Sequence, residues 1–230
     1  MNTGWSASLA LYMSTRITKI LEDGLDQQPT ERFIPEIQKG KIFDTGGLVG
    51  SGKLPLDADD DFFLGGEYDH LAKFDDGTYG VIDDKTSAVW TPEALSAEKM
   101  TTSYSRQLNA YSYCLEKPAD QKWLDRYWHC EMEELGNTLS KRAKVPHDAA
   151  EPVTVSRIVI NSYMVEKGVW GEAGELTLKT HRVFAEVEKD YDDLLVRCQE
   201  LADLTKLDSP PAGSKDCTFC KDFDKNVNYR

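Results

Sequence analysis

Two aspartates and one lysine, spaced across a predicted hairpin, are the residues of this sequence best suited to chemistry. Residues 66–74 (GEYDHLAKF) and 78–86 (TYGVIDDKT) have the character of short strands, and the DDG sequence between them is typical of a tight turn. A turn centred on Asp76 makes Asp69 and Asp83 direct cross-strand neighbours, because the two lie equally far from it along the chain. Their Cβ atoms are then expected to lie about 5 Å apart on one face of the sheet.

Two carboxylates at this spacing repel each other unless a positive charge lies between them. Because side chains alternate along a strand, Lys85 is expected on the same face as Asp83, whereas Asp84 is expected on the other face. Carboxylate oxygens favour hard cations such as Mg²⁺ or Mn²⁺. Such an ion can activate water and neutralise a phosphate, with Lys85 orienting the water or stabilising the developing charge. The alternative is a polar hairpin end in which Lys85 pairs with an aspartate across the surface.

A helix that follows the hairpin carries two more candidates. Its apolar stripe has helical spacing and consists of Tyr104, Leu108, Tyr111 and Leu115. Gln107 lies four residues before Tyr111, so the two are neighbours on the helix surface. Each can hydrogen-bond a nucleic-acid backbone or Lys85. Tyr111 belongs to the apolar stripe itself, so a role in the core explains it equally well.

The segments GEYD, VIDDKTS and YSRQLNAY, in this order, resemble the successive motifs of RecB-like PD-(D/E)XK nucleases, which include RecB and CRISPR-associated exonucleases. The resemblance implies that Asp69 is the aspartate of the G-x-x-D motif, with Asp83 and Lys85 as the D-x-K pair. Gln107 and Tyr111 match the Q-x-x-x-Y motif of the following helix.

The resemblance covers about residues 60–116 well and the later part of the chain more loosely. It implies a mixed α/β fold with a central mixed sheet flanked by helices, a restriction-endonuclease-like core. The implied activity is that of a Mg²⁺- or Mn²⁺-dependent DNA nuclease, an exonuclease of recombination, repair or defence. Single-stranded DNA or duplex ends are the implied substrates, and a helicase or recombination protein a further partner. Two alternatives stay open: a nuclease-like scaffold that binds DNA or a helicase without cutting, and a nuclease acting on RNA.

The metal site predicted from these motifs lacks one ligand. Similar nucleases carry a further His or Glu from an early helix, but no histidine precedes His70 in this sequence. Glu22, at the end of a helix predicted over residues 5–23, is the substitute we select, ahead of Glu31 and Glu36. An exposed glutamate at a helix end explains Glu22 as well. The scaffold alternative depends on this gap.

The five cysteines do not predict a cofactor. Some relatives hold an iron-sulfur cluster through one early and three late cysteines, but here none precedes Cys114 and none follows Cys220. We therefore do not expect an iron-sulfur cluster. Cys217 and Cys220 form a CxxC pair, which is either half of a zinc site or a packing motif of the tail. The odd number and irregular spacing of the five cysteines favour reduced thiols.

Other elements follow from hydrophobic periodicity. We expect strands over residues 153–166 and 175–185 and an acidic-started helix over 186–207. The inward side chains of this helix are predicted to be Val187, Tyr191, Leu194, Leu195, Cys198 and Leu201. Residues 46–66 are rich in Gly and Asp, which predicts a loop or an irregular strand.

Composition places the chain among single-domain cytosolic proteins. A single domain over residues 1–230 is expected, since no repeat or low-complexity linker divides the chain. No apolar run is long enough to cross a membrane, and the first residues lack the order of a signal peptide. The formal net charge of -13 argues against a broad basic surface, so any DNA contact must be local or assisted by metal. Aromatic residues over 123–128 and the basic group Lys141, Arg142 and Lys144 can contact a single strand, or form a core stripe and a solvated surface.

Overall fold

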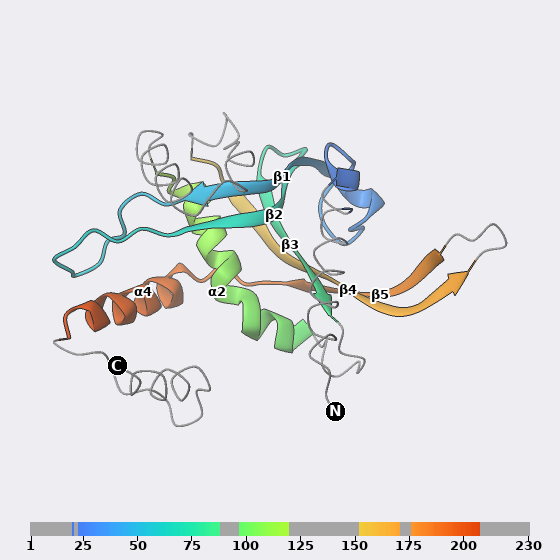
Figure 1. Cartoon of the computed structure of the whole chain (residues 1–230). Coiled ribbons are helices and arrows are strands. Elements are labelled where there is room, and N and C mark those ends of the chain that lie inside the picture. The colour runs from blue at the N-terminus through green and yellow to red at the C-terminus, as the bar shows by residue number, and fades with distance from the viewer. Residues whose placement is uncertain (1–19, 21–22, 88–96, 120–151, 171–175, 208–230) are drawn as a thin grey trace, which may run out of the picture.

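The computed structural model describes residues 20, 23–87, 97–119, 152–170 and 176–207 (Figure 1). In chain order the elements are the 3-10 helix η1 (Thr30–Arg32), strands β1 (Gly40–Gly50), β2 (Gly65–Phe74) and β3 (Tyr79–Ser87), helix α2 (Ala97–Glu116), strands β4 (Val155–Trp170) and β5 (Leu176–Glu186), and helix α4 (Tyr191–Thr205). The five strands form one sheet in the order β1-β2-β3-β4-β5. β3 and β4 are parallel and the other neighbours antiparallel, which confirms the predicted mixed α/β fold.

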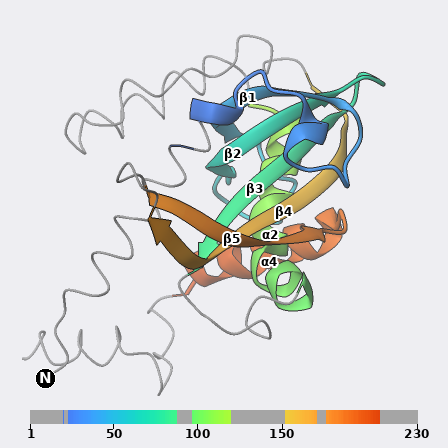
Figure 2. The same cartoon turned by 90° about the vertical axis from the view of Figure 1, so that its right-hand side faces the viewer.

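The two faces of the sheet carry separate apolar clusters. Helix α2 crosses one face (Figures 1 and 2), where its buried side chains pack on residues of β2, β3 and β4 that include Leu71, Val81 and Ile158. The segment around η1 packs on the other face, against residues that include Ile82. Because Val81 and Ile82 are adjacent and both fully buried, β3 is covered on both faces. The residues that follow them on β3 therefore project into two different environments.

The hairpin of β2 and β3 has the predicted turn and the predicted register. Gly77 adopts a positive φ of 85°, and the Asp76 side chain accepts a hydrogen bond of 2.9 Å from the backbone N of Thr78. His70 pairs with Ile82, and the pairing continues regularly toward the turn. Asp69 and Asp83 are the next residues away from the turn, beyond the pair His70 and Ile82. The turn therefore determines where the two aspartates lie relative to each other.

The glycine-rich region before the hairpin contains both predicted alternatives, an irregular strand and then a loop. Residues 46–50 form the end of β1, which pairs with β2 over Gly40–Gly50, so the loop begins only after them. At Gly47 a neighbouring side chain requires glycine, because a Cβ there would lie 2.2 Å from the Tyr68 hydroxyl. That hydroxyl donates a 2.6 Å hydrogen bond to Asp44. Glycine here makes room for a buried tyrosine.

The last helix begins later than predicted, and one of its side chains points outward. Asp190 caps α4 by accepting a 2.9 Å hydrogen bond from the backbone N of Asp193. Leu194 and Cys198 are buried as expected, but Leu201 is 63% exposed, so its predicted inward position is wrong. The buried side of α4 packs against α2 and against residues between β1 and β2, among them Leu54, and Leu201 lies outside this contact.

Several predicted features lie outside the described residues. They are most of the predicted first helix, residues 123–128, the basic group at Lys141, Arg142 and Lys144, and the Cys217 and Cys220 pair. Cys114 and Cys198, which the structure does describe, are free and buried, as expected of reduced thiols. Of the helices within the described ranges, none is both long and apolar enough to cross a membrane.

Candidate functional site

Asp69, Asp83 and Lys85 meet on the sheet face that packs against α2. Lys85 Nζ lies 2.6 Å from Asp83 Oδ2, and Asp69 Oδ2 accepts a 2.7 Å hydrogen bond from the backbone N of Asp84. Asp83 is 2% exposed, whereas the side chain of Lys85 keeps 21% of its surface. The site therefore has a buried carboxylate at its base and an ammonium group that reaches solvent.

Asp69, Asp83 and Lys85 together carry two negative charges and one positive charge when all three are ionised. Burial and then the neighbouring charge of Asp83 raise the pKa of Asp69 to about 7. Burial also raises the pKa of Asp83, although Lys85 opposes that shift. For Lys85 burial lowers the pKa, but the carboxylates of Asp83 and Asp69 more than offset it, so the net pKa is raised. Two carboxylates share one ammonium, and a further cation would relieve their repulsion.

Lys85 is held from two sides. Its Nζ lies 4.7 Å from the ring centroid of Tyr104 on α2, a cation-π contact. Its backbone carbonyl accepts a 3.0 Å hydrogen bond from the Ser162 hydroxyl of the neighbouring parallel strand. From the sequence, Tyr104 is predicted only as a member of the apolar stripe of the helix. Its spacing of seven residues before Tyr111 is the signal that places both on the helix face toward the site.

Gln107 and Tyr111 are neighbours, as predicted. Gln107 Nε2 donates a 2.7 Å hydrogen bond to the Tyr111 hydroxyl. Tyr111 is 9% exposed and belongs to the core cluster, while Gln107 is exposed. Burial raises the pKa of Tyr111, and the charge of Asp83 adds to that shift, which places the hydroxyl in the field of the carboxylates. Tyr111 is thus both a core residue and a neighbour of the site.

The residues present fit a hard divalent cation. The donors that Asp69 and Asp83 offer are carboxylate oxygens, and Mg²⁺ typically uses only one or two protein carboxylates. Asp83 Oδ2 is buried and accepts no hydrogen bond of ordinary geometry, its near neighbour being Lys85 Nζ. Within the part of the chain that the structure describes, no group of three His, Cys, Asp or Glu side chains is placed to hold a metal.

The three glutamates considered for the remaining ligand have different outcomes. Glu22 lies outside the described residues. Glu31 is an exposed residue of η1, which lies against the opposite face of the sheet. Glu36 pairs with Arg182, whose other contacts lead to Asp84 on that same opposite face. Neither Glu31 nor Glu36 is therefore placed to complete the site.

His70, the neighbour of Asp69 along the chain, contacts Asp84 and not the carboxylate pair. It is fully buried on the face away from Asp69, and its Nε2 lies 2.8 Å from Asp84 Oδ2. Sequence reasoning placed Asp84 on this face but gave it no role. The signal for a role of Asp84 is a charged residue in a strand that is covered on both faces, because a buried carboxylate needs hydrogen-bond partners.

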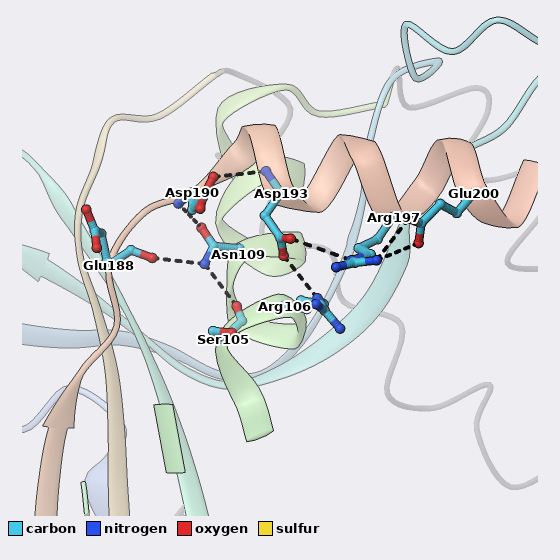
Figure 3. Close-up of polar contacts among 8 residues, drawn as sticks. All are labelled: Ser105, Arg106, Asn109, Glu188, Asp190, Asp193, Arg197 and Glu200. Atoms are coloured by element: carbon cyan, nitrogen blue, oxygen red, sulfur yellow. Dashed lines mark hydrogen bonds and ion pairs between the residues drawn. The ribbon is translucent and has the colours of Figure 1, made fainter. Parts of the chain in front are cut away.

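A second polar region lies between α2 and the start of α4, and Figure 3 shows its polar contacts. A cavity of about 420 Å³ opens there. The Asn109 amide donates a 3.0 Å hydrogen bond to the Glu188 carbonyl, and its Oδ1 accepts one of 2.8 Å from the backbone N of Asp190. Arg106 pairs with Asp193 at 3.0 Å. These contacts attach α4 to α2, and the residues predicted for chemistry do not line this cavity.

Comparisons with known proteins assign no family. No protein-family profile matches the chain, and no curated protein matches it. Six chains of solved structures match, among them one described as the crystal structure of SSO0001. It is 11% identical, with a TM-score of 0.40, over 89% of this chain and 63% of that one. This chain thus spans less than two thirds of the matched structure, and a likeness at this level carries no argument about function.

Proposed function

We propose that this protein is a metal-dependent DNA nuclease of the RecB-like PD-(D/E)XK type. The observation that carries the proposal is the meeting of Asp69, Asp83 and Lys85 on one sheet face, beside the bonded pair Gln107 and Tyr111. Exonucleolytic action, and a place in recombination, repair or defence, rest on the motif resemblance alone. So do the expected substrates, single-stranded DNA or duplex ends, and a helicase or recombination partner.

Each residue has a defined task in this proposal. Asp69 and Asp83 would hold Mg²⁺ or Mn²⁺, which when bound supplies an activated water and neutralises phosphate charge. Lys85, anchored by Asp83 and still open to solvent, brings a positive charge to the scissile phosphate and orients the attacking water. Gln107 offers an exposed amide for the nucleic-acid backbone, and the Tyr111 hydroxyl fixes that amide in place.

The test is a cleavage assay with end-labelled linear single-stranded and duplex DNA in Mg²⁺, Mn²⁺ or EDTA. Asp83→Asn and Lys85→Met keep the size of the side chains and remove the charges, so each should lower the rate by roughly 100-fold or more. Lys73→Met is the matched control, because Lys73 is an exposed lysine of β2. Wild-type rates for both variants would refute the proposal.

A different class of function has one observation in its favour. The described residues bring together two carboxylates but no group of three His, Cys, Asp or Glu side chains placed to hold a metal, which suits a nuclease-like scaffold that binds DNA or a helicase without cutting. A folded wild-type protein that retains DNA and cuts none of it in any metal would favour the scaffold. An RNA substrate of the same sequence, run in parallel, distinguishes a ribonuclease from both.

A further inference from the structure

A polar network lies on the sheet face opposite the carboxylate pair, and Asp84 is at its centre. The side chains of Asp84 and His70 are both 0% exposed, and His70 Nε2 lies 2.8 Å from Asp84 Oδ2. The other oxygen, Oδ1, accepts a 2.9 Å hydrogen bond from Asn161 Nδ2. Both oxygens of the Asp84 carboxylate are therefore bound, one by β2 and the other by β4.

The network continues to the edge of the sheet. Asn161 Oδ1 accepts a 3.3 Å hydrogen bond from Arg182 of β5. Arg182 also donates to the backbone carbonyl of Phe33 at 3.0 Å and pairs with Glu36. The Asp84 side chain thus contacts β2 and β4 directly, and Asn161 and Arg182 extend the network to β5 and to the segment after η1.

The backbone of Asp84 connects this network to the carboxylate pair. Asp84 stands between Asp83 and Lys85, whose side chains meet on the other face. Its N–H donates the 2.7 Å hydrogen bond to Asp69 Oδ2. Any movement of Asp84 along or out of the strand would therefore change the direction of Asp69 and shift both of its own neighbours.

We propose that His70 and Asn161 are positioning residues of this site. They bind the Asp84 side chain on one face of the sheet. The Asp84 N–H then orients the Asp69 carboxylate, which belongs to the site on the other face. This inference rests on the proposed nuclease function for its catalytic consequence, while the orientation of Asp69 is a property of the protein by itself.

Packing alone does not explain the network. Its neighbours on the same face are apolar, among them Ala72, Ile82 and Val159. Buried charged and polar groups are expensive to desolvate, and apolar side chains of similar volume often give equal or greater stability. The polar residues occur at the same height along β3 as the carboxylate pair on the opposite face. This is the part of the strand whose position determines the geometry of the pair.

The experiment compares two substitutions of His70 with a packing control. His70→Gln keeps a donor near the place of Nε2, whereas His70→Leu removes it. Val159→Ala deletes buried methyl groups on the same face without touching Asp84. We expect His70→Leu to lower kcat on DNA by about 10- to 100-fold with little change in KM, and His70→Gln and Val159→Ala to stay near the wild type.

A second readout is independent of cutting. In ¹⁵N-labelled protein the Asp84 amide proton should exchange slowly and resonate downfield because it is bonded to Asp69; His70→Leu should move it upfield and speed its exchange. His70→Asn, polar but too short to reach Asp84, serves if the leucine variant does not fold. If the wild type cuts no DNA, the proposed function fails, and the amide signal still decides the positioning. An unchanged amide signal, or equal kcat for His70→Leu and Val159→Ala, would overturn the inference.

Discussion

At the scale of single residues, the carboxylate pair is costly for folding. Asp69 and Asp83 are removed from water and face each other's charge, and Lys85 neutralises only one of them. Residues arranged in this way lower the stability of the charged state. Strongly perturbed carboxylates in one cluster are typical of functional sites, because the same features that oppose folding favour the binding of a cation.

The raised pKa of Asp69 predicts a specific dependence of stability on pH. Since the folded pKa of about 7 lies above the ordinary 3.8, the folded state binds the extra proton between these values. The stability from this group is therefore present below pH 3.8 and lost as pH rises toward 7. Asp69→Asn should remove that loss, so its melting temperature in EDTA should exceed that of the wild type at pH 8 by roughly 5 °C. The two proteins should differ little near pH 4; a constant difference from pH 4 to pH 8 would refute this.

Tyr104 should affect catalysis through the position of Lys85. The ring lies 4.7 Å from the ammonium, and a partly exposed cation-π contact contributes about 0.5–1 kcal/mol. Tyr104→Leu should lower kcat about two- to fivefold, whereas Tyr104→Phe, which keeps the ring, should retain wild-type kcat. Steady-state kinetics on DNA at saturating Mg²⁺ measure this. An equal loss in both variants would show that the hydroxyl, not the ring, is the important group.

At the scale of elements, local signals could be predicted from the sequence and long-range contacts could not. The turn at Asp76 determines the hairpin register, and with it the position of Asp69 opposite Asp83. The alternation of side chains along β3 places Lys85 on the same face as Asp83. The sequence left a loop and an irregular strand open for residues 46–50, because the reason for Gly47 is a tyrosine on the next strand. Glu36 could not be excluded as a ligand from the sequence, since its partner Arg182 is far along the chain.

The contact between β2 and α2 predicts a large effect from a small substitution. A Cβ on Gly66 would lie 2.4 Å from Cε1 of Tyr111, so Gly66→Ala must displace the ring and with it Gln107. Overpacking of this kind costs about 1–3 kcal/mol, which urea denaturation measures, and the cleavage rate should fall as well. Gly52→Ala is the matched control, because its nearest contact would be an ordinary 3.6 Å. Equal stability of the two variants would contradict the packing argument.

At the scale of the whole molecule, the negative net charge of the protein disfavours the binding of DNA, the proposed substrate. The chain has 27 Lys and Arg against 40 Asp and Glu, a formal net charge of -13. Nonspecific affinity for DNA comes largely from neutralised phosphates, so a protein of this charge gains little from its general surface. In the proposed mode, binding then depends on a few contacts, namely Lys85, the metal ion and the side-chain amide of Gln107.

This argument predicts a shallow dependence of DNA binding on salt. Each neutralised phosphate contributes about -0.9 to the slope of log K against log salt, so a local site should give a slope between about -1 and -3. Fluorescence anisotropy with labelled single-stranded DNA measures it, with Ca²⁺ replacing Mg²⁺ to slow cutting, and EDTA should abolish binding. Lys85→Met should reduce the slope by about 1, whereas Lys206→Gln, which alters an exposed lysine at the end of α4, should leave it unchanged.

A slope steeper than about -6 would mean that DNA follows an extended basic surface. The contacts would then have to come mainly from residues other than the carboxylate site, and the local mode of binding would be wrong.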